Sequence, residues 1–199
     1  MEKENTFLSE LTRQFLKLPG VGNKSARRFA YHIMKMPKLQ VENFSKAVLD
    51  TRNSIETCKI CGSLTNYKTC DICRDTSRDV SFICVVAESK DIFHIEKSCQ
   101  FNGVYHVLGG VISPLYGIGP NDIKIDSLEK RVFENKIREV MIATGTSVEG
   151  EATAVYISKI LKTSSVKISR LAYGICVGSD LEFTDEITIS HAISGRKEI

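Results

Sequence analysis

The first 57 residues place apolar side chains at the three- and four-residue intervals of amphipathic helices. Three such sets occur, each suited to one face of a helix. They are Phe7, Leu11 and Phe15; Ala26, Phe29, Ala30 and Ile33; and Val41, Phe44, Val48 and Ile55. The pattern predicts an all-helical N-terminal unit.

A different pattern begins after Arg78. Residues 80–87, VSFICVVA, form a continuous apolar run rich in β-branched side chains, which is typical of a strand buried on both faces. Strand-like and helix-like stretches then alternate. The expected strands are 80–87, 104–108, 139–144 and 166–171, and the expected helices are 91–98, 128–135 and 151–161. This alternation predicts a mostly parallel sheet with right-handed crossovers, and with the helical unit it makes the chain α/β and multidomain.

Composition narrows the class of protein without indicating its function. The chain has 199 residues, of which 42% are hydrophobic and 26% charged, ordinary values for one or two globular domains. Its apolar runs are far shorter than the roughly 20 residues of a membrane span, and the polar N-terminus lacks a signal-peptide core. Seven cysteines, an odd number, fit metal binding in a reducing compartment better than a secreted disulfide framework. We therefore expect a cytoplasmic protein with no membrane contact.

Charge is more informative by its position than by its sum. The formal net charge is only +3. Residues 11–41, however, contain no Asp or Glu and seven basic side chains: Arg13, Lys17, Lys24, Arg27, Arg28, Lys35 and Lys38. This basic stretch predicts an anionic partner for the helical unit.

The segment KLPGVGNKSARR, residues 17–28, lies inside that stretch and resembles a phosphate loop. A nucleotide P-loop needs G-x4-G-K-[ST] after a strand, but Asn23 precedes Lys24 and the flanking pattern is helical. A helix, a tight turn and a second helix fit better, with Gly20 and Gly22 free to take positive φ. Lys24, Arg27 and Arg28 then lie near a helix N-terminus, where free N–H groups attract anions. The prediction is sequence-independent binding to the phosphate backbone of a polynucleotide; the alternative is an ordinary helical hairpin with a solvated basic face.

Four cysteines form the clearest metal signal. Cys58, Cys61, Cys70 and Cys73 have the spacing C-x2-C-x8-C-x2-C, which supplies a tetrahedral set of four thiolates for one structural Zn²⁺. A redox pair or incidental cysteines are the alternative. The spacer between the two pairs is long enough for a hairpin. Cys84, within an apolar strand, is expected to be a small core residue, whereas Cys99 and Cys176 lie outside the pattern.

Three acidic residues follow expected strands. Glu88 comes after the first strand, and Glu149 and Glu151 come after the third, where functional groups collect in open parallel sheets. Their carboxylates can converge on one Mg²⁺, or they can simply favour a helix N-terminus. Spacing does not decide between these. The loop 109–120 is long for a compact α/β unit, which is typical of a functional loop of unassigned chemistry.

These motifs occur together in an order that resembles the bacterial RecR family of recombination mediators. The segments that carry the resemblance are LPGVGNKSARR, the four-cysteine finger, ICVVAESKD, PLYGIGP, VEGEAT and GSDLEFTDEITISHAISGR. The resemblance implies a helix-hairpin-helix DNA-binding region at 1–57, a four-cysteine zinc finger at 58–79, a Toprim domain at 80–173 and a C-terminal segment with a Walker-B-like motif at 174–199.

The resemblance also implies a function. Such proteins are not enzymes; they form dimers or ring-like tetramers that encircle DNA, and with RecO and RecF they help load RecA onto gapped DNA. It assigns Lys24 and Arg28 to DNA contact, the four cysteines to zinc, and Glu88, Glu149 and Glu151 to partner contact rather than cleavage. The alternative is a Mg²⁺-dependent Toprim nuclease, primase or topoisomerase-like enzyme, although the chain has no room for a supporting domain with a nucleophilic Tyr.

Two departures from the family pattern bear on these expectations. Gly145, Thr146 and Ser147 stand where the family usually has Asn-Pro-Thr, which predicts a looser acidic turn. Asn23 stands where the family often has Pro, and as a good N-cap residue it is expected to start the second helix.

Overall fold

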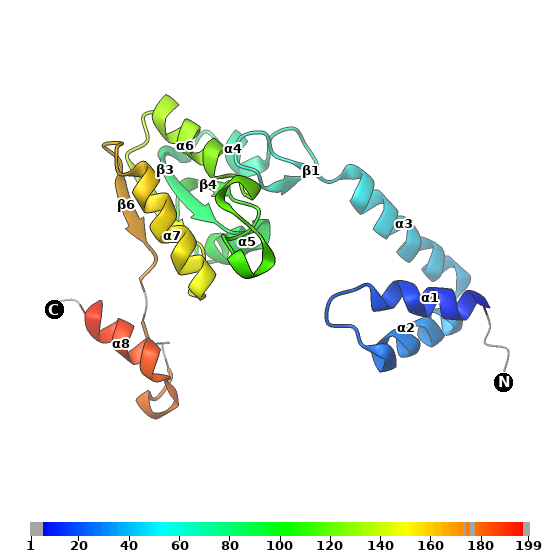
Figure 1. Cartoon of the computed structure of the whole chain (residues 1–199). Helices are drawn as coiled ribbons and strands as arrows, with labels where there is room; N and C mark the ends of the chain where they lie inside the picture. The colour runs from blue at the N-terminus through cyan, green and yellow to red at the C-terminus, as the bar shows by residue number, and fades with distance from the viewer. Residues whose placement is uncertain (1–5, 173, 176–177, 197–199) are drawn as a thin grey trace. The chain divides into compact units, whose positions relative to one another are not determined.

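The computed structural model describes residues 6–172, 174–175 and 178–196, so Cys176 lies outside the described residues. The chain divides into two compact units, Met1–Ile55 and Glu56–Ile199. We call them the helical unit and the sheet unit (Figure 1). The four-cysteine segment belongs to the same compact unit as the sheet.

The helical unit consists of α1 (Thr6–Leu16), α2 (Asn23–Lys35) and α3 (Lys38–Ser54), which confirms the three helices expected from periodicity. The helices α1 and α2 pack against each other. Phe15 and Phe29 meet edge to face, with ring centroids 5.6 Å apart, and Ala26 and Ala30 are fully buried beside them. The third helix, α3, has no buried residue.

The sheet unit is built around four parallel strands in the order β4-β3-β5-β6. The strands are β3 (Asp79–Val86), β4 (Gly103–Val107), β5 (Glu139–Ala143) and β6 (Lys167–Arg170). The helices that connect them are α5 (Ser89–Lys97), α6 (Ile125–Glu134) and α7 (Val148–Leu161). The expected alternation of strand and helix is therefore confirmed. Val86 lies opposite both Val107 and Ala143, so the carboxyl ends of three strands are level.

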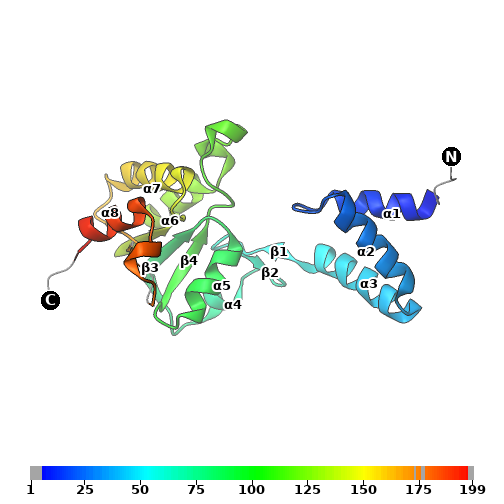
Figure 2. The ribbon, with the colours of Figure 1, turned by 90° about the horizontal axis from the view of Figure 1, so that it is seen from below.

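Helices cover both faces of this sheet, which explains why β3 is apolar throughout. Ile83 and Val85 point into a core shared with α6 and α7, whereas Cys84 and Val86 point into a second core shared with α5. Figure 2 shows α5 and α7 on opposite sides of the sheet. Cys84 is fully buried, as expected of a core residue.

The four-cysteine segment packs directly on this sheet. It contains β1 (Glu56–Thr57), β2 (Leu64–Thr65) and the short helix α4 (Asp71–Arg74). The two strands pair across the first cysteine pair, so the hairpin that forms encloses Cys58 and Cys61. The Val107 amide donates to the Cys61 carbonyl over 2.7 Å. Gly62 has a φ of +78°, and a Cβ there would lie 2.9 Å from the Val107 carbonyl oxygen.

The remaining segments are a loop and a C-terminal helix. The loop 109–120 is closed by a bridge between Ser113 and Ile118 and leaves Leu115 and Tyr116 largely exposed. The helix α8 (Glu186–Ser194) starts at Asp185, whose side chain accepts the Thr188 amide over 2.9 Å. None of the helices described is both long and apolar enough to cross a membrane.

Candidate functional sites

The turn between α1 and α2 has the geometry of a phosphate grip, with two differences from expectation. Gly20 adopts a positive φ of +76°, as expected. Gly22 instead has an extended conformation and is the N-cap of α2, so the expectations of a positive φ for Gly22 and of an N-cap role for Asn23 are wrong. Because Gly22 has no side chain, the first N–H groups of α2 lack a side-chain cap. An incoming anion can accept hydrogen bonds from uncapped groups of this kind.

Basic side chains surround that helix start. Lys24 and Arg28 lie one turn apart on α2, Arg27 lies beside them, and all three are exposed. The Arg28 guanidinium carbon lies 5.7 Å from the centroid of the Phe29 ring. Across residues 6–172, 174–175 and 178–196, no carboxylate comes within 4.0 Å of any of these three cations. Their charge is therefore available to an external anion.

The four cysteines are brought together. Their sulfur atoms all lie within 4.8 Å of one another, with Cys61 and Cys70 3.6 Å apart. Cys58, Cys61 and Cys70 are buried. Four sulfurs at Zn–S distances of about 2.3 Å in a tetrahedron are about 3.8 Å apart, so this donor set fits a zinc ion. The knuckle is shaped by the Gly62 amide, which donates to the Cys58 carbonyl over 2.9 Å.

Without a cation, the four thiols do not all ionise, because burial raises the pKa of Cys70 to about 11. A hydrogen bond from Cys73 lowers the pKa of the Cys61 thiol to about 5, and the same contact raises the pKa of Cys73. Zinc bound here would take the place of the thiol protons and hold four thiolates. Four sulfur ligands leave no open position for a substrate, so the arrangement is that of a structural site.

The first of the three acidic positions, Glu88, follows β3 and caps α5. Its backbone amide donates to the Asp91 carboxylate over 2.8 Å. Its own carboxylate lies 2.8 Å from the Lys90 ammonium. Glu88 therefore stabilises a helix N-terminus, which is the structural alternative to Mg²⁺ binding that the sequence left open.

The other two acidic positions, Glu149 and Glu151, lie in the first turn of α7, after β5. The turn before them is held closely, because Ser147 Oγ accepts the Gly150 amide over 3.1 Å and Thr144 Oγ1 donates to the Gly150 carbonyl over 2.8 Å. The turn that contains Gly145, Thr146 and Ser147 is therefore held at both ends by hydrogen bonds to Gly150. A Cβ at Gly150 would lie 2.4 Å from the Thr144 carbonyl oxygen, so only glycine fits there.

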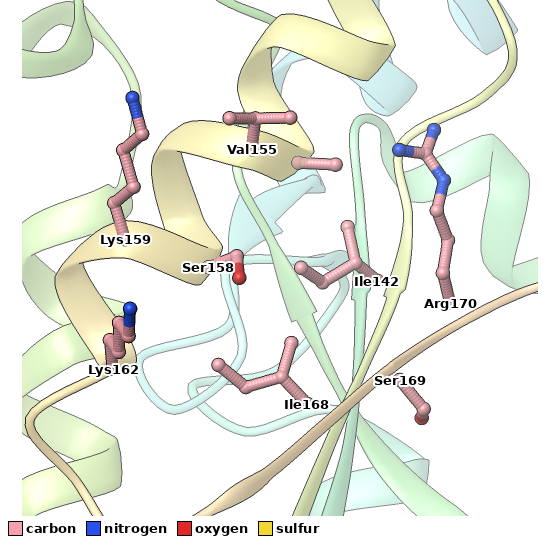
Figure 3. Close-up of a pocket in the computed structure, with 9 residues that line it drawn as sticks. Ile142, Val155, Ser158, Lys159, Lys162, Ile168, Ser169 and Arg170 are labelled. Carbon is pink, nitrogen blue, oxygen red and sulfur yellow. The ribbon is translucent and has the colours of Figure 1, made fainter.

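A residue that sequence reasoning missed holds this turn from the next strand. Arg170, the last residue of β6, pairs with the Glu151 carboxylate over 2.7 Å and donates to the Gly145 carbonyl over 2.8 Å. Figure 3 shows its side chain across a pocket of about 530 Å³ from Lys159 on α7. The signal that could have found it is its place at the carboxyl end of the expected strand 166–171, beside the acidic turn.

The structure thus places the three acids at one end of the sheet without gathering them as it gathers the cysteines. Among the described residues, three or more possible metal ligands of the types His, Cys, Asp and Glu come together at the four cysteines, whose ligand atoms lie within 4.8 Å of one another. The three acids do not form such a group. Two of the three acids have basic partners, Lys90 for Glu88 and Arg170 for Glu151.

Three family matches cover most of the chain. Residues 8–51 match the RecR helix-hairpin-helix family, and residues 174–197 match the RecR C-terminal family. Residues 81–172 match the Toprim domain family.

The chain belongs to the RecR family. The matches confirm the resemblance and the fold class given above: a helix-hairpin-helix unit, a four-cysteine cluster and a Toprim domain with a parallel sheet. The RecR domains indicate a recombination mediator that binds DNA in the RecFOR pathway of DNA repair, and a non-catalytic one, although Toprim domains are usually enzymatic.

Proposed function

We propose that this protein is a cytoplasmic, non-catalytic recombination mediator that holds DNA by its phosphate backbone. The observation that carries the proposal is the pair Lys24 and Arg28, exposed and without a carboxylate partner in the described chain, beside the uncapped start of α2. The segment that contains them matches the RecR helix-hairpin-helix family. Arg27, Gly20 and Gly22 complete the proposed contact.

The physical character of this surface supports binding that ignores base sequence. Glycines and free amides at a helix start contact phosphate oxygens, which are the same for every base. Neutralising phosphates with lysine and arginine releases condensed counterions, so the affinity should fall as salt rises.

The experiment compares two double variants with equal charge. We expect Lys24→Ala with Arg28→Ala to weaken binding to gapped and duplex DNA of any sequence at least about tenfold, and to reduce the slope of log affinity against log salt by roughly 2. Lys46→Ala with Arg52→Ala, on α3 of the same unit, is the control. Fluorescence anisotropy over a salt series measures both. Equal weakening by the two pairs would contradict a local grip.

We further propose that copies of the chain assemble into a dimer or a ring-like tetramer around DNA, and that the assembly works with RecO and RecF to load RecA onto gapped DNA. Large apolar side chains left exposed on one side of α3, which has no buried residue, support self-assembly: Phe44 and Val48 lie one helical turn apart. Apolar surface of this extent on a small unit is typical of an interface.

For the Toprim acids we propose contact with a partner protein rather than cleavage. The basic partners of Glu88 and Glu151 support this, because a carboxylate held by Lys or Arg is less available to a metal. The test is incubation of the zinc-loaded protein with supercoiled and gapped DNA and Mg²⁺. We expect intact DNA after incubation. Cutting that Glu88→Gln abolishes would establish the alternative, a Mg²⁺-dependent Toprim enzyme.

A further inference from the structure

A partly buried arginine lies next to the four-cysteine cluster and takes no part in the sites above. Arg131 is on α6 and lines, together with Cys73, a cavity of about 630 Å³. The walls of this cavity come from the four-cysteine segment, from β3 and β4, and from α6 and the residues after it.

The position of Arg131 is fixed by the strand on which the cysteine segment packs. One guanidinium nitrogen donates to the Tyr105 carbonyl over 2.7 Å. Two residues further along the same strand, the Val107 amide donates to the Cys61 carbonyl. Arg131 and the cysteine cluster are therefore held by the same five-residue strand, β4.

Arg131 has no carboxylate partner in the part of the chain that the structure describes. None of the ion pairs found there includes it, although Glu134 lies on the same helix and lines the same cavity. A guanidinium removed from water without a compensating charge is costly, so another negative group is expected to face it.

The four cysteines supply that negative charge. Burial lowers the pKa of Arg131, and the cysteine thiolates act in the opposite direction, with the largest of their contributions from Cys73. One Zn²⁺ with four thiolates has a formal charge of −2, which is itself unfavourable away from water. Lys59, Lys130 and Lys136 also line the cavity, but all three are exposed, so water screens their charge.

We propose that Arg131 is the outer-shell cation of the zinc centre, offsetting the negative charge of the four thiolates and so slowing the loss of the metal. It is a positioning residue, because it acts on the ion through the thiolates and binds no metal itself. The proposal rests on zinc binding by the four cysteines and is independent of the DNA grip on the helical unit. Outer-shell partners of metal ligands typically contribute 10- to 100-fold to metal affinity.

The test uses the full chain loaded with zinc. Arg131→Gln keeps a donor for the Tyr105 carbonyl but removes the charge, and we expect zinc transfer to an excess of a chromogenic chelator to become at least about tenfold faster. Arg131→Lys keeps the charge and should stay within about threefold of the unaltered protein. Lys130→Gln, on the same helix and cavity, should stay within about twofold.

A merely structural role would give a different result. It would lower the stability of the metal-free and zinc-loaded proteins equally, whereas the proposed role acts on the zinc-loaded form, as denaturant unfolding of both forms would measure. Unchanged zinc release from Arg131→Gln, or tenfold faster release from Arg131→Lys, would overturn the proposal. If Arg131→Gln does not fold, the lysine variant still decides by its release rate. Failure of the unaltered chain to take up zinc would refute the metal site and leave the DNA titration unaffected.

Discussion

Two arginines show how the setting of one side chain determines what it can bind. Arg28 is exposed and has no carboxylate partner in the described chain, so its charge can reach an external phosphate. Arg170 is partly buried and tied to the Glu151 carboxylate and the Gly145 carbonyl, so its charge holds the acidic turn. Sequence reasoning assigned Arg28 to DNA contact but overlooked Arg170. Their different roles follow from neighbours that folding brings close.

His106 gives a prediction at the same scale. It is buried on β4, its Nε2 donates to the Lys124 carbonyl over 2.9 Å, and its Nδ1 has no partner among the described residues. Burial, together with the charges of Arg131 and Lys124, lowers the pKa of His106 to about 4. Between about pH 6.5 and pH 4, His106 is therefore protonated in the unfolded chain and neutral in the folded chain. The free energy of unfolding decreases as the pH falls through this range.

We expect His106→Gln to remove this part of the pH dependence. The free energy of unfolding of the sheet unit should fall by roughly 2 kcal/mol less between pH 7 and pH 5 than in the unaltered protein. Denaturant unfolding at both pH values, with the zinc content checked, measures the difference. His94→Gln, at an exposed position on α5, should keep the original pH dependence. Identical curves for His106→Gln and the unaltered chain would contradict the assignment.

Among the elements, strands and helices could be predicted wherever a local pattern determines them. The run 80–87 is apolar on both faces because β3 has a core on each side, and that pattern is visible in the sequence. The N-cap of α2, Gly22, could not be predicted, because Gly22 and Asn23 are both acceptable N-caps and the turn geometry decides. The packing of the four-cysteine segment on β4 could not be predicted from the sequence either. It depends on a backbone hydrogen bond between Cys61 and Val107, and backbone groups are the same in every residue.

That packing predicts that zinc and the sheet are coupled. Chelation of zinc should speed hydrogen–deuterium exchange at the β4 amides, because the Val107 amide would lose a firmly held acceptor on the cysteine segment. The amides of α1 and α2, in a separate compact unit, should exchange at an unchanged rate. Cys61→Ser should reproduce the effect without a chelator. Protection of β4 that persists in the metal-free protein would mean that the segment folds without its ion.

At the scale of the whole molecule, the proposed DNA-binding residues and the metal-binding cysteines belong to different compact units. The basic turn belongs to the helical unit, and the cysteines and acids belong to the sheet unit. The net charge of +3 is small, so we expect the acid-free stretch 11–41, rather than the whole chain, to attract an anionic partner. The three module types could be predicted from motif order, whereas assembly depends on surfaces such as that of α3.

The assembly prediction uses two variants of α3 with equal change in charge. Phe44→Glu with Val48→Glu places two carboxylates on the exposed apolar side, and we expect light scattering to show a shift toward the monomer. Lys46→Gln with Asn53→Glu makes the same change of −2 on the opposite side of the helix and should leave the mass unaltered. An unchanged mass in both variants would place the interface elsewhere.

The position of the four-cysteine segment has a consequence for solubility. β4 is an edge strand that pairs with β3 alone, yet all five of its residues are buried, and its Val107 amide is taken by the Cys61 carbonyl. An apolar edge strand with free backbone groups is a template for pairing with other chains. The cysteine segment thus shields β4 from pairing with other chains. Loss of its metal would expose this edge strand, and the protein would aggregate before the rest of the sheet unfolds.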